Sequence, residues 1–199
     1  AIYYSNLPGE GLRKVLALTF AVFGVALLAW YLFSARRVLP LLIFFAAFLL
    51  LVFWWSTIPP KQDRDWAPEY VRLPYATRND DLVTIHNIRN FDYRTETDFT
   101  PRYYDKTFDL RQLDSVDVIA SYWMGEAIAH IFLSFGFADK DFLAISIETR
   151  RQRHQSYSTI AGFFKQYELL YVVADERDLI GLRTNYRKDP PEDVYLYRT

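Results

Sequence analysis

Two adjacent runs, AIAHIFLSFGF (Ala127–Phe137) and DFLAISIETR (Asp141–Arg150), decide the fold class. Both are rich in aromatic and β-branched residues, and only the short segment Ala138–Lys140 separates them. Two strand-like runs joined by about three residues predict a β-hairpin. We therefore expect a sheet that is built mainly from antiparallel strands.

The hairpin brings a histidine and a glutamate together. If Ala138–Lys140 is the loop, Phe137 pairs with Asp141, and the numbers of paired residues sum to 278. His130 then lies opposite Glu148 on the same face of the sheet. Directly opposed residues have Cβ atoms about 4.5–5.5 Å apart, which is close enough for an imidazole–carboxylate contact. A carboxylate in that position fixes the tautomer of a histidine and raises its basicity, as in acid–base dyads.

Two alternatives stay open for this pair. The contact is either catalytic or a structural hydrogen bond between two half-buried polar groups. The register also depends on the loop: a two-residue loop places Ile147 opposite His130, and a four-residue loop places Thr149 there. Either shift moves Glu148 to the other face of the sheet.

The sequence of the rest of the domain predicts further strands and two helices. Alternating or apolar β-rich runs favour strands at Leu82–Tyr93, Val116–Met124, Tyr167–Ala174 and Asp193–Arg198. Tyr167–Ala174 is almost entirely apolar, so we expect it in the middle of the sheet. Helices are expected at Tyr157–Gln166, with Ser156 or Ser158 as the N-cap, and at Asp175–Arg187, where an acidic start and a basic end suit the helix dipole. Residues 94–108 read as turn-rich, and the fold class is α+β.

The first 58 residues have the character of a membrane anchor. Val15–Phe33 and Val38–Trp55 are runs without a charged residue. At about 1.5 Å per residue each run is long enough to cross roughly 30 Å of hydrocarbon. The connection Ser34–Arg37 is so short that the two helices must form an antiparallel hairpin, with both outer ends on one side of the membrane. The two arginines of the connection favour a cytoplasmic loop, whereas basic residues at the outer ends favour the reverse.

Composition excludes several classes of protein. Lys+Arg number 23 against 24 Asp+Glu, and no basic face stands out, so a nucleic-acid binder is not expected. With no cysteine, the 199 residues can form no disulfide. His86, His130 and His154 lack metal-ligand spacing, and no glycine-rich phosphate loop occurs, so we expect neither a metal nor a cofactor.

Several motifs, taken in order, resemble one family. They are HNIRNFDYR (86–94), AHIFLSFGF (129–137), SIETR (146–150), QYEL (166–169), DERDLI (175–180) and LRTN (182–185). Together they resemble the Lnb N-terminal periplasmic domain family over residues 66–199, and the family carries a hydrophobic hairpin in front of this domain.

The resemblance implies a circularly permuted papain or NlpC-type fold with thiol chemistry. In the family a histidine on a strand, a polar partner on the next strand and a cysteine at a helix start act together. His130 and Glu148 match the first two roles. The cysteine belongs to an Asn-Cys-Thr-Thr-like motif beyond the strand that matches Val194–Arg198, so these 199 residues are expected to be inactive without it.

Two functions follow from this reading. The first is a membrane-anchored thiol acyltransferase or amide hydrolase that acts at the lipid surface, with His130 as the base and Glu148 as its orienting group. The second is a non-catalytic accessory subunit that docks through its hairpin on a larger membrane protein complex. In either case we expect a transmembrane hairpin over residues 1–58, a linker over 59–80 and a periplasmic domain over 81–199. Membrane lipid would be a partner, and the bacterial inner membrane the location.

Overall fold

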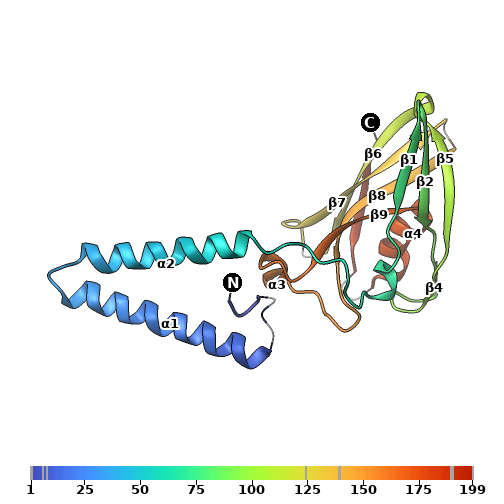
Figure 1. Cartoon of the computed structure of the whole chain (residues 1–199). Helices are drawn as coiled ribbons and strands as arrows, with labels where there is room; N and C mark the ends of the chain where they lie inside the picture. Colours follow the sequence, from blue (N-terminus) through green and yellow to red (C-terminus); the bar gives the residue numbers. More distant parts are fainter. Residues whose placement is uncertain are drawn as a thin grey trace. The chain divides into compact units, whose positions relative to one another are not determined.

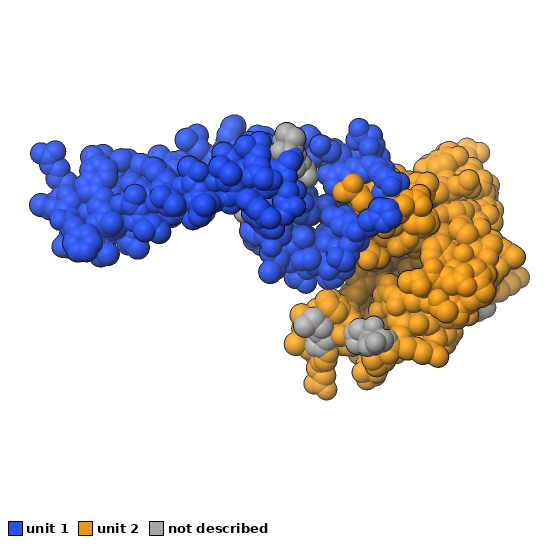
Figure 2. Space-filling model, turned by 90° about the horizontal axis from the view of Figure 1, so that it is seen from below, with its two compact units in different colours: residues 1–65, 154–168 blue, residues 66–153, 169–199 orange. Residues whose placement is uncertain are grey.

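The computed structural model describes residues 2–5, 7, 9–123, 125–138, 140–188 and 191–198. They form two compact units, which Figure 2 colours separately. The first unit combines residues 1–65 with residues 154–168. The second combines residues 66–153 with residues 169–199.

Two long helices make up most of the first unit. Helix α1 spans Glu10–Phe33 and α2 spans Val38–Ser56, and both are long and apolar enough to cross a membrane. Only 6% of each apolar window is buried within the protein, so their side chains face the surroundings. The two predicted spans are therefore confirmed as helices, and they lie side by side as a hairpin (Figure 1).

A short helix completes this unit. Helix α3 spans Thr159–Phe163, and the Ser158 side chain accepts a hydrogen bond from the Ala161 N–H. Ser158 is thus the N-cap, one of the two residues that the sequence proposed, although the helix is shorter than the predicted Tyr157–Gln166.

The second unit is a curved sheet with short helical segments (Figure 1). Its strands follow the order β1-β2-β9-β8-β7-β6-β10, and β5 also pairs with β2. Their bounds are Tyr75–Asn79 (β1), Leu82–Arg89 (β2), Tyr103–Asp109 (β5), Leu113–Tyr122 (β6), Ala129–Phe137 (β7), Asp141–Arg150 (β8), Glu168–Ala174 (β9) and Asp193–Tyr197 (β10). Strands β3 (Asp92–Tyr93) and β4 (Phe99–Thr100) form a separate two-stranded ribbon, and short helical turns lie at Pro68–Tyr70 (η1) and Leu110–Gln112 (η2). The α+β class with a mainly antiparallel sheet is confirmed, and β9 lies within the sheet as expected, with one parallel contact to β2.

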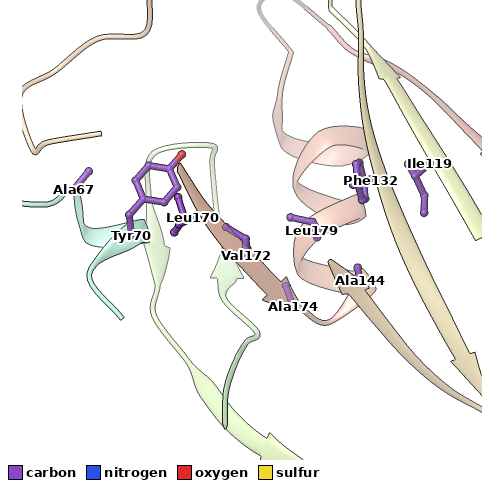
Figure 3. Close-up of a cluster of buried hydrophobic side chains, with 9 residues drawn as sticks. All are labelled: Ala67, Tyr70, Ile119, Phe132, Ala144, Leu170, Val172, Ala174 and Leu179. Atoms are coloured by element: carbon purple, nitrogen blue, oxygen red, sulfur yellow. The ribbon is translucent and has the colours of Figure 1, made fainter. Parts of the chain in front are cut away.

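The alternation of side chains along the strands builds a core on each face of the sheet. Even-numbered residues such as Phe132, Ala144 and Val172 form one cluster with Leu179 of helix α4 (Glu176–Gly181). Figure 3 shows Leu179 pointing from this helix toward the sheet. Odd-numbered residues, including Val173, form the second cluster with side chains of β2 and β5. Each face of the sheet therefore carries one buried cluster, because successive side chains of a strand point to opposite faces.

Three predicted segments need correction. Part of the expected linker, residues 75–79, is strand β1, whose side chains are all exposed. The stretch 94–108, expected to consist of turns, contains β4 and most of β5. The helix expected at Asp175–Arg187 is α4 followed by a wider π turn, η3 (Leu182–Tyr186), which ends where the Arg187 N–H reaches the Leu182 carbonyl at 3.1 Å. Two predicted features include Asp139 and Met124, which lie outside the described residues.

A buried ion pair joins α4 to the β2 side of the sheet. Asp178 is fully buried and accepts hydrogen bonds from Nε and Nη2 of Arg89 at 2.7–3.1 Å. The same carboxylate accepts the Phe91 N–H at 2.7 Å and the Tyr93 hydroxyl at 3.2 Å. Burial alone would lower the pKa of Arg89, but the charge of Asp178 raises it overall, so the arginine stays charged. The sequence identified Asp178 only as part of the acidic start of a helix, and it did not indicate this distant partner.

Candidate functional site

The predicted pairing of β7 with β8 is confirmed. Leu133 pairs with Ile145 and Phe137 pairs with Asp141, so the paired numbers sum to 278. At the far end of these strands His130 Nε2 lies 3.3 Å from Glu148 Oε1. The two side chains thus share one face and lie close together, as the hairpin arithmetic predicts.

A serine links the two residues more tightly than direct contact does. Ser146 lies on the same face of β8, and its Oγ is 2.7 Å from His130 Nε2 and 2.8 Å from Glu148 Oε1. The side chains of His130 and Glu148 are 27% and 18% exposed, so the group is partly shielded from water. Ser146 lies two residues before Glu148 on the strand and therefore on the same face, but the sequence indicated no role for it in the pair.

The hydrogen-bond network assigns the tautomer of His130. The Ser146 hydroxyl has one proton, which it donates to the Glu148 carboxylate. Ser146 can then only accept from His130, so the imidazole proton lies on Nε2. A lone pair on Nε2 would instead face a carboxylate oxygen 3.3 Å away, which is repulsive. The neutral ring therefore has its free lone pair on Nδ1, and a general base needs such a lone pair to accept a proton.

An arginine from another element holds Glu148 in its ionised form. Arg183 of η3 is 3% exposed and donates to Glu148 Oε1 at 2.7 Å. Its other end group donates to the Leu179 carbonyl at 2.9 Å, and the guanidinium lies over the Phe132 ring at 4.8 Å. Burial would raise the pKa of Glu148, but the hydrogen bond from His130 and the charge of Arg183 hold this pKa well below its usual range. The carboxylate is thus a fixed negative charge behind the imidazole.

A second buried acid supports the arginine. Glu192 accepts a hydrogen bond from Arg187 at 2.6 Å and lies 3.7 Å from Arg183 Nε. It also accepts from Ser121, which pairs with His130 across β6 and β7. Arg183 and Glu192 were not predicted as site residues, because no spacing in the sequence connects η3 or the β10 end with the hairpin.

Glu148 borders a cleft of about 370 Å³ within the second unit. Glu148 and Arg183 contribute to its wall, together with apolar side chains such as Leu179 and Leu182. The wall is otherwise charged and aromatic, with Glu69, Tyr70, Arg89, Tyr93, Glu96, Arg151 and Arg187. A substrate group of modest size therefore has room beside the carboxylate that orients His130.

The other histidines lie elsewhere. His86 Nδ1 is 2.8 Å from Asp105 and its Nε2 is 3.3 Å from Thr77, and the ring stacks on Tyr75. His154 is exposed in the first unit. Among the described residues no group of three or more His, Cys, Asp or Glu side chains is placed to hold a metal ion.

The comparisons with known proteins agree with this architecture. The family model of the Lnb N-terminal periplasmic domain matches residues 99–199, which include His130, Ser146, Glu148 and Arg183. No curated protein and no solved structure is detectably similar to the chain. Two apolar helices precede the matched domain and are long enough to span a bilayer. The chain therefore belongs to the Lnb N-terminal periplasmic domain family, as a membrane-anchored protein with a periplasmic part.

Proposed function

We propose that the periplasmic domain carries the base of a thiol-dependent acyl-transfer or amide-hydrolysis site. The observation that supports this most is the hydrogen-bonded series from His130 through Ser146 to Glu148, with Arg183 behind the carboxylate. Arg183, which is 3% exposed, keeps the glutamate ionised, as the carboxylate behind a catalytic imidazole must be. The series leaves Nδ1 of the imidazole to accept a proton.

In this proposal the nucleophile is a cysteine that lies outside the 199 residues, which contain none. His130 Nδ1 takes the thiol proton as the sulfur attacks an acyl carbonyl. A carbon–sulfur bond forms, the bond to the leaving alcohol or amine breaks, and the imidazolium returns the proton to that leaving group. An amine or water then accepts the acyl group by the reverse proton path. Glu148 stabilises the imidazolium while it carries the extra proton, as a triad carboxylate does.

The membrane anchor makes lipid-linked substrates accessible to this site. A domain tethered by two spans stays within a short chain length of the bilayer, which raises the local concentration of membrane substrates. We place the anchor in the bacterial inner membrane with the Ser34–Arg37 loop in the cytoplasm. The cleft beside Glu148 would receive the polar group next to the reacting carbonyl.

The experiment labels membranes that contain the product of the complete gene with an alkyne-tagged acyl probe that reacts with thiols. Removal of a general base costs about 10²–10⁴-fold in rate, so His130→Gln should lower labelling by about that factor. Glu148→Gln should lower it too, because the amide cannot stabilise the imidazolium. His154→Gln is the matched control, since His154 is exposed in the other compact unit. Unchanged labelling in His130→Gln, at equal protein level and circular dichroism, would contradict the proposal.

A second function has its own support. The 199 residues contain no cysteine, and the two apolar helices expose nearly their whole surface. Both features suit a non-catalytic accessory subunit that docks through its hairpin on a larger membrane protein complex. Bulky side chains such as Phe45 and Phe53 are 56% and 68% exposed and would fit grooves on a partner. Native gels in mild detergent test this: a band at the monomer mass alone would rule out the docked subunit.

A further inference from the structure

The segment His154–Glu168 exposes apolar side chains although it is not part of a membrane span. Ile160 is 58% exposed and Phe163 is 74% exposed, and both belong to the short helix α3. Residues three apart on a helix lie on one side of it. Tyr157, which precedes the helix, is 48% exposed. The segment thus presents a small aromatic and aliphatic surface.

Contacts fix this segment at the end of the second membrane helix. Lys165 Nζ donates to the carbonyls of Trp55 at 3.0 Å and Ser56 at 3.3 Å, and it lies 4.4 Å from the Trp55 ring centroid. These carbonyls belong to the last turn of α2, which lacks later helical N–H donors, and the Trp55 carbonyl also accepts the Ile58 N–H at 3.4 Å. Phe164 stacks on Tyr4 of the N-terminal segment, with ring centroids 5.3 Å apart. All of these residues lie in one compact unit (Figure 2).

The segment is also held on its other side. Glu168 accepts a hydrogen bond from the Lys61 N–H at 2.9 Å and pairs with Arg64 at 3.0 Å, where both side chains are about 10% exposed or less. The Tyr167 hydroxyl accepts from the Ser158 N–H at 2.7 Å and donates to the Ser156 carbonyl at 2.8 Å. The exposed apolar side chains therefore lie on a segment that hydrogen bonds and an ion pair hold in place.

We propose that residues 157–164 contact the bilayer at the boundary between headgroups and acyl chains. The end of α2 carries Trp54 and Trp55, the residue type that favours this boundary. Lys165, held at that helix end, supplies a cation of the kind that accompanies apolar residues in interfacial segments. In this arrangement Ile160 and Phe163 enter the lipid on the side of the membrane from which the chain leaves α2.

This contact would give the chain a second attachment to the membrane. Strand β9 begins at Glu168, the last residue of the segment, so the chain runs from the interfacial contact directly into the sheet. The chain would then be tied to the bilayer at two places, through the span and through α3. The proposal does not depend on the chemistry of His130.

The absence of cysteine allows a direct test. Phe163→Cys in the chain of residues 1–199 gives a single thiol, which is labelled with an environment-sensitive nitrobenzoxadiazole fluorophore before reconstitution in vesicles of phosphatidylethanolamine and phosphatidylglycerol. Leu196→Cys is the matched control, because Leu196 is apolar and 48% exposed on β10 of the other unit. At position 163 we expect the label to emit at a shorter wavelength than at position 196. Lipids with a nitroxide near the headgroup should quench most of its fluorescence, and iodide should quench little of it. The control should show the reverse.

Two results would overturn the proposal. Iodide quenching at position 163 equal to that at position 196 would mean that the segment lies in water. Protection from both iodide and lipid nitroxides would mean that protein covers it. Ile160→Cys, labelled in the same way, provides a second position on the same surface in case one variant folds poorly.

Discussion

Neutralising Asp178 should be among the most damaging single changes in the periplasmic domain. This carboxylate is fully buried and holds the side chain of Arg89, which is 8% exposed, by hydrogen bonds of 2.7–3.1 Å. In Asp178→Asn the shape is kept, but the charge that balances the buried guanidinium is lost. One amide hydrogen of the new side chain must also face a donor, since Arg89 offers only donors.

The expected loss follows from this geometry. Removing one partner of a buried ion pair costs about 3–5 kcal/mol, because the other charge stays buried and uncompensated. The Phe91 N–H and the Tyr93 hydroxyl also depend on this carboxylate, so the effect should lie toward the upper part of that range. Replacing both charges by apolar residues, as in Arg89→Met with Asp178→Leu, should recover the part of the loss that comes from the uncompensated charge, but not the part that comes from the Phe91 N–H and the Tyr93 hydroxyl, which lose this acceptor.

The assay is urea unfolding of the complete chain in detergent micelles, followed by near-ultraviolet circular dichroism of the aromatic residues. The midpoint should fall while the slope with urea stays constant. Asp98→Asn is the control, because Asp98 pairs with Arg94 at a site where both side chains are more than half exposed. The control should unfold like the wild type.

Two results would refute the reasoning. A loss below about 1 kcal/mol for Asp178→Asn would mean that the buried pair does not need its negative charge. A double variant that loses as much as the single one would mean that packing and the hydrogen bonds from Phe91 and Tyr93, and not charge compensation, stabilise the domain.

Further predictions concern the site, the packing of the hairpin and the topology. Because the folded-state pKa of Glu148 is lowered, its charge stabilises the fold fully above the unfolded pKa of about 4.3, and this stabilisation is lost as the pH falls through the folded pKa. The difference in unfolding free energy between wild type and Glu148→Gln should therefore be constant at neutral pH and shrink in acid; a constant difference down to pH 3 would contradict this. Gly136→Ala should lower the free energy of unfolding in urea by about 1–3 kcal/mol, since the new Cβ would overlap the Ser115 hydroxyl. An unchanged midpoint would show that Ser115 and strand β6 can shift without cost. External protease should digest residues 60–199 in spheroplasts, and their protection would overturn the periplasmic orientation. A thiol-reactive acyl probe should leave a protein of residues 1–199 unlabelled, because it has no cysteine; labelling would exclude a cysteine as the reacting group.

Local rules in the sequence were sufficient for the hairpins. The two membrane helices follow from the length of uncharged chain that a bilayer requires, and a four-residue connection forces them to be antiparallel. The facing of His130 and Glu148 follows from one loop length and from the two-residue period of a strand. Both inferences use neighbouring residues only, so the chain itself fixes their geometry.

Strand β1 shows where such local rules fail. Its five side chains are all exposed, so the sequence carries no alternation of apolar and polar residues there. The strand forms because its backbone pairs with β2, from Tyr75 with His86 to Asn79 with Leu82. Backbone hydrogen bonds are the same for every residue type, and only the folded sheet shows that an edge is available.

The environment of the candidate site was decided by tertiary structure. Arg183 lies 35 residues beyond Glu148 and reaches it from η3, the π turn that follows α4. In the sequence, Asp178 is likewise only an acidic residue at a helix start. In the structure it is the buried partner of Arg89, which lies 89 positions earlier in the chain. The sequence by itself determined that a three-residue loop brings His130 and Glu148 onto one face of the β7–β8 hairpin, and the structure shows that register. Which charges lie behind them depends on how distant segments pack, because an ion pair leaves no periodic signal along the chain and forms only where the fold removes both partners from water.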